Sequence, residues 1–204
     1  MKLHWSPRSP FVRKVMIVLY EGGIEDQVQC VRTPVAMDKP NLDLVADNPL
    51  IKLPTLMLDD GTALYDSRVI CAYLDGLTGG RLMPAAATAR LVAERRQALG
   101  DGFLDALLLY RQERNKPVDK QTAAWLDAFA LKVRAVLAAL EAEAPALEAT
   151  PFDLGVISIG CALSYMDYRF PDIDWRGGHP RLAAWHQGFS ERPSVARSLP
   201  DESP

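Results

Sequence analysis

The sequence contains few cysteines and histidines, and neither residue type clusters. Its 204 residues include three cysteines, Cys30, Cys71 and Cys161, none of them in a C-x-x-C pair, and three scattered histidines. An odd, dispersed set of cysteines argues against a disulfide framework and fits a reducing compartment. Cys30 and Cys71 fall within an expected strand and an expected helix, which favours core positions over reactive thiols. We therefore expect no metal site, and packing or surface roles for the histidines.

The sequence also lacks a strong charge of either sign and a long hydrophobic run. Lysine and arginine number 23 against 26 aspartate and glutamate residues, a net charge of −3. Without a basic block, nucleic acid and anionic membrane surfaces are not expected partners. The longest uncharged apolar stretch, residues 154–163, is too short to span a bilayer. The first eight residues have no apolar core of a secretory signal. These features predict a cytoplasmic protein with no membrane partner.

The chain contains two halves with different sequence patterns, and the first alternates short apolar runs with turn signals. The expected elements are a strand at 2–5, a helix at 11–20, a strand at 28–32, a weak helix or irregular segment at 38–46, two strands at 55–58 and 63–65 around the turn D-G, and a helix at 67–77. The order β-α-β-(α)-β-β-α predicts a thioredoxin-like, α/β domain over residues 1–78.

The second half has a helical pattern. Residues 85–116 contain no proline, residues 119–144 contain neither proline nor glycine, and apolar side chains recur at helical spacing in both. The segment T-P-F-D predicts the start of a further helix, with Thr150 as its N-cap and Asp153 as an acidic partner. We expect an all-helical C-terminal domain over residues 87–204, joined to the first domain by a linker at 79–86.

The start of the first helix carries the most informative pair of residues. Ser9 followed by Pro10 predicts an N-cap with proline at the first helical position. A helix N-terminus presents unpaired N–H groups and a partial positive charge, which favour a thiolate. Thiol-redox proteins place a cysteine at such a strand-to-helix turn, whereas this chain places a hydroxyl there. We infer that the reactive sulfur arrives with a ligand.

Four segments in order resemble the glutathione S-transferase superfamily. They are S-P-F-V-R-K-V at 9–15, N-P-L-I-K-L-P-T-L at 48–56, D-S at 66–67 and T-P-F-D at 150–153. The first is most similar to a bacterial group typified by proteins called YibF. Ile51 stands where the family commonly has glycine. The resemblance covers essentially the whole chain and implies a homodimer that binds glutathione.

The resemblance also implies roles for individual residues in binding glutathione. Ser9 would donate a hydrogen bond to the glutathione sulfur, with Ser6 as the alternative donor. A cis Leu53–Pro54 bond would present the N–H and C=O of Leu53 to the tripeptide backbone. A trans proline that merely precedes a strand is the alternative. Phe11 would complete the site near Ser9.

The charged ends of glutathione would be held by three further residues. Asp66 would bind the ammonium of the γ-glutamyl group, and Ser67 would bind its carboxylate at a helix N-terminus. The alternative is a helix capped by Ser67 with Asp66 placed favourably on the dipole. Lys52 would reach the glycine carboxylate, or remain a solvated surface lysine.

The implied activity is conjugation of glutathione to a small electrophile, with glutathione as co-substrate and no metal. Because position 9 is not cysteine, thiol–disulfide exchange through a protein sulfur at this position is blocked. The alternatives are a non-catalytic binding or regulatory protein, or a glutathione-dependent isomerase or dehalogenase. The residues expected to line an electrophile pocket between the domains are Trp5, Arg8, Phe103, Tyr110, Arg114 and Tyr165.

Overall fold

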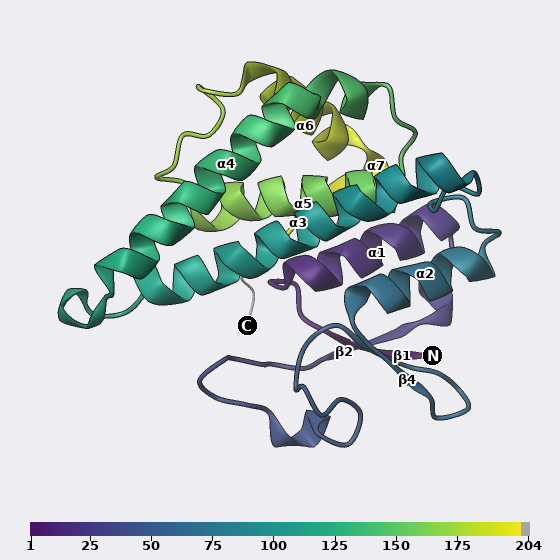
Figure 1. The fold of residues 1–204 in the computed structure, drawn as a ribbon. Helices are drawn as coiled ribbons and strands as arrows, with labels where there is room; N and C mark the ends of the chain where they lie inside the picture. The colour runs from purple at the N-terminus through teal and green to yellow at the C-terminus, as the bar shows by residue number, and fades with distance from the viewer. Residues whose placement is uncertain (201–204) are drawn as a thin grey trace. The chain divides into compact units, whose positions relative to one another are not determined.

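The computed structural model describes residues 1–200 and divides the chain into two compact units, which we describe separately. Unit 1 comprises residues 1–90 together with the C-terminal segment from Pro193, and unit 2 comprises residues 91–192. Figure 1 shows the order of elements along the chain, first strands and helices, then helices only. This order matches the predicted combination of a thioredoxin-like domain and an all-helical domain.

Unit 1 contains a four-stranded mixed sheet in the order β2-β1-β3-β4. The strands are β1 (Lys2–Trp5), β2 (Gln29–Arg32), β3 (Thr55–Met57) and β4 (Ala63–Leu64). β1 runs parallel to β2 and antiparallel to β3, and β3 is antiparallel to β4. Leu3 and Leu56 are register partners at the centre of the sheet, and both are fully buried. The weak helix expected at 38–46 is a single 3-10 turn, Leu42–Leu44.

Two helices of unit 1, α1 (Pro10–Gly22) and α2 (Ser67–Leu77), pack side by side on the sheet (Figure 1). α1 ends at Gly23, whose φ of 63° is in the left-handed region that glycine adopts without strain. A 3-10 turn, Glu25–Gln27, then leads into β2. α1 begins shortly after β1 ends, and α2 begins shortly after β4 ends. The N-terminus of each helix therefore lies near the end of a strand, where a ligand site can form.

The C-terminal segment belongs to unit 1, whereas the helical sequence pattern predicted one all-helical domain over residues 87–204. The short helix α7 (Pro193–Ala196) lies against α1. The Nε of Arg13 donates to Ser198 Oγ at 3.2 Å, and Arg197 pairs with Glu25 at 3.0 Å. These side-chain contacts hold the segment, and the helical pattern of its sequence does not reveal them.

Unit 2 consists of helices: most of α3 (Ala87–Arg114), then α4 (Ala123–Glu148), α5 (Leu154–Arg169) and α6 (Pro180–Glu191), with a 3-10 turn at Val118–Lys120. Residues 154–166 of α5 are all buried, as the uncharged run predicts. α3 and α5 approach closely at Gly100, where an added Cβ would lie 2.5 Å from the backbone carbon of Ser158. α4 continues through Pro145, beyond the proline-free run.

The predicted N-cap of α5 is wrong. Asp153 is the N-cap, because its carboxylate accepts a 2.8 Å hydrogen bond from the N–H of Val156. Thr150 lies too far before the helix to do so, and its hydroxyl donates instead to the carbonyl of Ala146 at the end of α4. Burial raises the pKa of Asp153, and the Val156 N–H opposes this shift.

Two other expectations are corrected. α2 is capped by Asp66 and not by Ser67, because the Asp66 carboxylate accepts from the N–H of Arg68 at 2.9 Å. Cys71 is fully buried as expected, whereas Cys30 is exposed because β2 is an edge strand.

Within residues 1–200, no helix is long and apolar enough to cross a membrane. The same residues contain no group of three or more His, Cys, Asp or Glu side chains that could hold a metal ion.

Candidate functional site

The first part of the candidate site is the turn that leads from β1 into α1. The N–H of Ser9 donates to the carbonyl of Ser6 at 3.2 Å, which closes the turn. Ser9 is the N-cap of α1, as predicted, and its Oγ accepts from the N–H of Val12 at 3.3 Å. Accepting this bond leaves the hydroxyl hydrogen of Ser9 available to donate. The first turn of α1 has no acidic residue, so nothing there neutralises the positive end of the helix dipole.

Ser6 remains the alternative donor, because it belongs to the same turn. Its Oγ accepts a long hydrogen bond of 3.4 Å from the N–H of Arg8, which likewise leaves the hydroxyl hydrogen available. Trp5 and Phe11 are half-buried beside this turn, and Arg8 is exposed. The turn therefore offers two hydroxyl groups and the N-terminus of α1.

The second part of the site is the segment that precedes β3. The Leu53–Pro54 bond is cis, as the resemblance implies. Leu53 packs in one buried cluster with Val12 of α1 and with Leu44, so this segment adjoins the first turn of α1. In the described part of the chain, no hydrogen bond involves the backbone N–H or C=O of Leu53. Lys52 is exposed.

Asn48, whose role was not predicted, stabilises the conformation of this segment through buried hydrogen bonds of its side chain. Its side chain is 1% exposed, and its Nδ2 donates to the carbonyl of Lys52 at 3.2 Å and to Thr55 Oγ1 at 2.9 Å. The N–H of Ile51 donates to the Asn48 carbonyl at 2.9 Å, and Ile51 has a φ of 52°. This left-handed conformation favours glycine, which explains why the family commonly has glycine at this position.

The third part of the site is the N-terminus of α2, at Asp66 and Ser67. Asp66 follows a second cis peptide bond, Tyr65–Asp66, and Ser67 is buried in the first turn. Both residues are where the prediction places them, at a helix end whose first N–H groups lack intrahelical partners. Such an end binds a carboxylate without any further cation.

Arg68 and Lys14 add two cations near Asp66 that sequence reasoning missed. The guanidinium of Arg68 donates to Asp66 Oδ2 at 3.0 Å. Partial burial raises the pKa of Asp66, but the bonds from Arg68 and the charges of Arg68 and Lys14 outweigh it and hold the pKa below its ordinary value. Asp66 is therefore a carboxylate at neutral pH, the state that holds an ammonium group.

The predicted pocket residues of unit 2 lie on α3 and α5, mostly in the core. Phe103 and Tyr165 are buried, and the ring of Tyr110 stacks on Phe170 with centroids 5.5 Å apart. Arg114 covers both rings and pairs with Asp172 at 2.6 Å, so its charge already has a partner. A pocket that these residues share with Trp5 and Arg8 of unit 1 stays a prediction.

Tyr165 stays protonated in this setting. Burial raises the pKa of its phenol, while the guanidinium groups of Arg111 and Arg169, which hydrogen-bond to it, act in the opposite direction. A protonated phenol donates a hydrogen bond and does not act as a base at neutral pH. Sequence reasoning named Tyr165 for the pocket but missed the two arginines that fix its hydroxyl.

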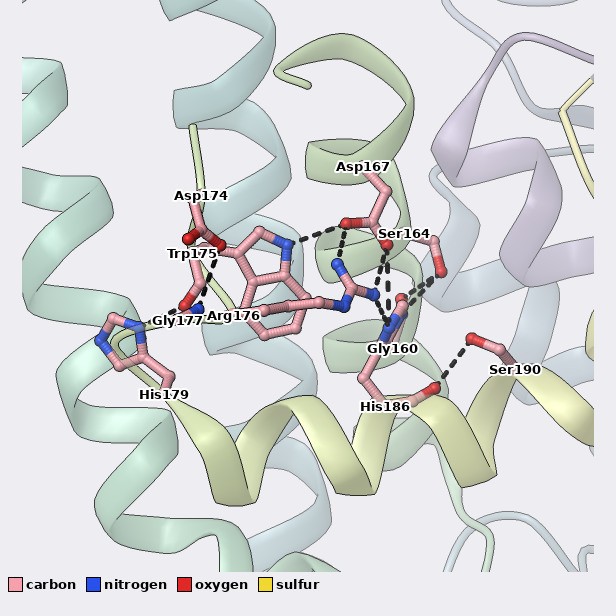
Figure 2. A network of polar contacts seen from close by, with 10 residues as sticks. All are labelled: Gly160, Ser164, Asp167, Asp174, Trp175, Arg176, Gly177, His179, His186 and Ser190. Atoms are coloured by element: carbon pink, nitrogen blue, oxygen red, sulfur yellow. Dashed lines mark hydrogen bonds and ion pairs between the residues drawn. The ribbon is translucent and has the colours of Figure 1, made fainter. Parts of the chain in front are cut away.

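A second polar cluster of unit 2 contains a serine, a histidine and an aspartate and is shown in Figure 2. The buried ring of His186 lies between Ser164, at 2.9 Å from Nε2, and Arg176, at 3.0 Å from Nδ1. Arg176 also pairs with Asp167, which accepts a further bond from Trp175 Nε1 at 2.9 Å. The cluster joins α5, α6 and the segment between them.

This cluster is not built for nucleophilic catalysis. Since a guanidinium group only donates, Nδ1 of His186 accepts from Arg176 and Nε2–H donates to Ser164. The Ser164 hydroxyl in turn donates to the carbonyl of Gly160 at 2.8 Å, and Asp167 lies 3.8 Å from Nδ1. A serine nucleophile needs the opposite arrangement, with Nε2 accepting the serine proton. The expected packing role of the histidines therefore fits His186.

Comparisons with known proteins agree with this fold. The family model for the glutathione S-transferase N-terminal domain matches residues 8–77, and the model for the C-terminal domain matches residues 123–188. The "Uncharacterized GST-like protein YibF" of Escherichia coli (strain K12) is 30% identical over the full length of both chains.

Two solved structures of a glutathione transferase family member from Pseudomonas fluorescens Pf-5 are also similar. The structure with bound glutathione is 43% identical, with a TM-score of 0.94 and 98% of each chain covered. The structure with bound S-(propanoic acid)-glutathione is 41% identical, with a TM-score of 0.90 and 98% and 99% of the two chains covered. The thioredoxin-like domain, the helical domain and these matches over the whole length together show that the chain belongs to the glutathione S-transferase family.

Proposed function

We propose that this protein binds glutathione on unit 1, ionises its thiol beside Ser9 and joins the sulfur to a small electrophilic carbon. The carbon either loses a leaving group or belongs to an activated double bond that then takes up a proton. The product is a thioether in both cases. The related Pseudomonas structure with bound S-(propanoic acid)-glutathione, itself a thioether of glutathione, supports this reaction class.

The observation that carries the proposal is the capping geometry of Ser9. Its Oγ accepts from Val12, so its hydrogen remains for a sulfur placed before α1. A thiol with a pKa of about 8.5 is mostly protonated at neutral pH, and each pKa unit corresponds to about 1.4 kcal/mol. A hydrogen bond to a charged group contributes about 1.5–3 kcal/mol, enough to lower the thiol pKa by one to two units.

The same geometry supports a docking mode for the rest of the tripeptide. The N–H and C=O of Leu53, which make no hydrogen bond within residues 1–200, would pair with the cysteinyl backbone as with a short added strand. The N-terminus of α2 with Ser67 would bind the γ-glutamyl carboxylate, and the ionised Asp66 would bind the adjacent ammonium. Phe11 and Lys52 complete the proposed contacts.

The test combines binding, turnover and product analysis. We expect the protein to be retained on immobilised glutathione, and to conjugate glutathione to an activated aryl chloride with release of chloride. Mass spectrometry should show the aryl thioether. Retention without any turnover of a panel of aryl halides and activated alkenes would favour the non-catalytic binding protein. A product that is isomerised or has lost its halogen, and that carries no glutathione, would favour a glutathione-dependent isomerase or dehalogenase.

We also propose a homodimer in the cytoplasm with a role in detoxification, as the family resemblance implies. A homodimer predicts twice the chain mass of 22.5 kDa in light scattering. A mass equal to one chain at micromolar concentration would contradict it.

A further inference from the structure

A buried histidine on β1 bonds to two residues of the connection between β2 and β3. This connection contains Leu53, whose backbone is proposed to bind glutathione. His4 of β1 is 7% exposed. Its Nδ1 lies 2.8 Å from Thr33 Oγ1, and its Nε2 lies 2.7 Å from Asp47 Oδ2. These partners are 29 and 43 residues away, at the beginning and in the second half of the connection between β2 and β3. One imidazole ring therefore links two distant points of this connection.

Both ring nitrogens of His4 have a hydrogen-bond partner whether the ring is neutral or protonated. The carboxylate of Asp47 only accepts, so Nε2 donates to it, and Lys2 Nζ donates to the same oxygen at 3.1 Å. The bond from His4 is the main factor that lowers the pKa of Asp47, which keeps it ionised at neutral pH. Thr33 Oγ1 either accepts from Nδ1–H while donating to the Val31 carbonyl at 3.1 Å, or donates to Nδ1.

A short series of contacts runs from Asp47 to the segment before β3. The N–H groups of Asp47 and Asn48 both donate to the carbonyl of Leu44, at 3.1 and 2.8 Å. Asn48 then fixes the Lys52 carbonyl and the Thr55 hydroxyl, as described above. Thr55 is also the register partner of His4 across β1 and β3. His4 thus holds this segment through its backbone pairing and through its side chain.

We propose that His4 and Asp47 are positioning residues for glutathione. They hold residues 44–55 in the conformation that presents the backbone of Leu53, and they touch neither the sulfur nor the electrophile. A segment that is already ordered loses less conformational entropy on binding, so these residues set glutathione affinity and not the chemical step. This inference rests on the function proposed above.

The direct test compares two substitutions of His4 by calorimetry with glutathione. An asparagine amide reaches the position of Nδ1 but not Asp47, whereas a glutamine amide reaches the position of Nε2 and keeps the bond. We expect His4→Asn to raise the Kd for glutathione about tenfold, the effect of losing a hydrogen bond to a charged group, and His4→Gln to raise it less than about threefold. The kcat at saturating glutathione should change less than about twofold in both variants.

Hydrogen exchange without glutathione gives a second readout. The amides of Asp47, Asn48 and Ile51, whose bonds hold the segment, should exchange faster in His4→Asn than in wild type and be restored in His4→Gln. Asp47→Ala serves if His4→Asn does not fold, because the Asp47 side chain is 22% exposed, so water can take its place beside the Nε2–H of His4. It should raise the Kd and the exchange rates in the same direction.

His186→Asn is the matched control, because it makes the same substitution in unit 2. His186 is also buried, bonds to a hydroxyl and lies near a carboxylate. Its variant should bind glutathione within about twofold of wild type. Wild-type affinity in His4→Asn and Asp47→Ala, or an equal loss in His186→Asn, would overturn the positioning role alone. Absence of binding by the wild-type protein would instead overturn the proposed function, and the positioning role with it.

Discussion

Ser9 combines a structural and a proposed chemical role in one hydroxyl group. Its oxygen caps α1 by accepting from Val12, which leaves its hydrogen available to donate. Sequence predicted the cap because the signal is local, a serine followed by Pro10 after a strand. The choice between Ser9 and Ser6 could not be predicted, since both lie in one turn and both retain a donor hydrogen.

Replacing Ser9 by alanine tests the proposed thiol activation. Loss of one to two pKa units of stabilisation should lower kcat/KM at pH 7 about 8- to 25-fold, and should move the acidic limb of its pH profile, where the thiol ionises, upward by about one to two pH units. Ser6→Ala is the matched control and should stay within about twofold of wild type. If Ser9→Ala conjugates as fast as wild type and Ser6→Ala does not, the donor is Ser6.

Asp66 illustrates which details of the site could not be predicted from the sequence. Its position before α2 follows from the motif, but its pairing with Arg68 and the nearby charge of buried Lys14 arise from how α1 and α2 pack. The same holds for Asn48, which the motif contains but whose buried hydrogen bonds depend on the fold of residues 48–55. Motifs located these positions, and tertiary contacts determined their partners.

At the scale of elements, the helix pair α3 and α5 packs through glycines. An added Cβ at Gly100 would lie 2.5 Å from the backbone of Ser158, whereas one at Gly102 on the same helix has nothing within 4 Å. Gly100→Ala should therefore lower the free energy of unfolding by roughly 1–3 kcal/mol through overpacking. Gly102→Ala should raise it by up to about 1 kcal/mol through helix propensity. Denaturant unfolding measures both, and equal effects of the two would contradict the packing.

The network of Figure 2 joins α5 to the segment that follows it, and its contribution to the free energy of unfolding should depend on pH. Burial raises the pKa of Asp167, but the bonds from Arg176 and Trp175 and the charge of Arg176 outweigh it, so its pKa is lowered on folding. A lowered carboxyl pKa contributes stability that is present above the unfolded value of about 3.9 and lost as pH falls through the folded value.

Asp167→Asn tests this sign. Its loss of unfolding free energy relative to wild type should be largest near neutral pH and shrink at lower pH, below about pH 4. The exposed Asp119 provides the control, since Asp119→Asn should change the unfolding free energy by less than about 0.5 kcal/mol. A difference for Asp167→Asn that grows on acidification would contradict the ion pair.

At the scale of the whole molecule, the order of elements and the change to an all-helical second half could be read from the sequence. Alternation of short apolar runs with turn residues, followed by long helical periodicities, was sufficient for this. The assignment of the C-terminal segment to unit 1 could not be read in this way, because it depends on bonds such as Arg13 to Ser198 between residues far apart. The N-cap of α5 was missed for a related reason, since Thr150 and Asp153 are both good caps and only the helix start distinguishes them.

Isothermal titration of the wild-type protein with glutathione, followed by thermal unfolding with and without the ligand, tests the central claim most directly. The account predicts a saturable heat at one site per chain and a melting temperature that rises with glutathione concentration, as binding to the folded state requires. No heat and no rise in melting temperature at millimolar glutathione would contradict it.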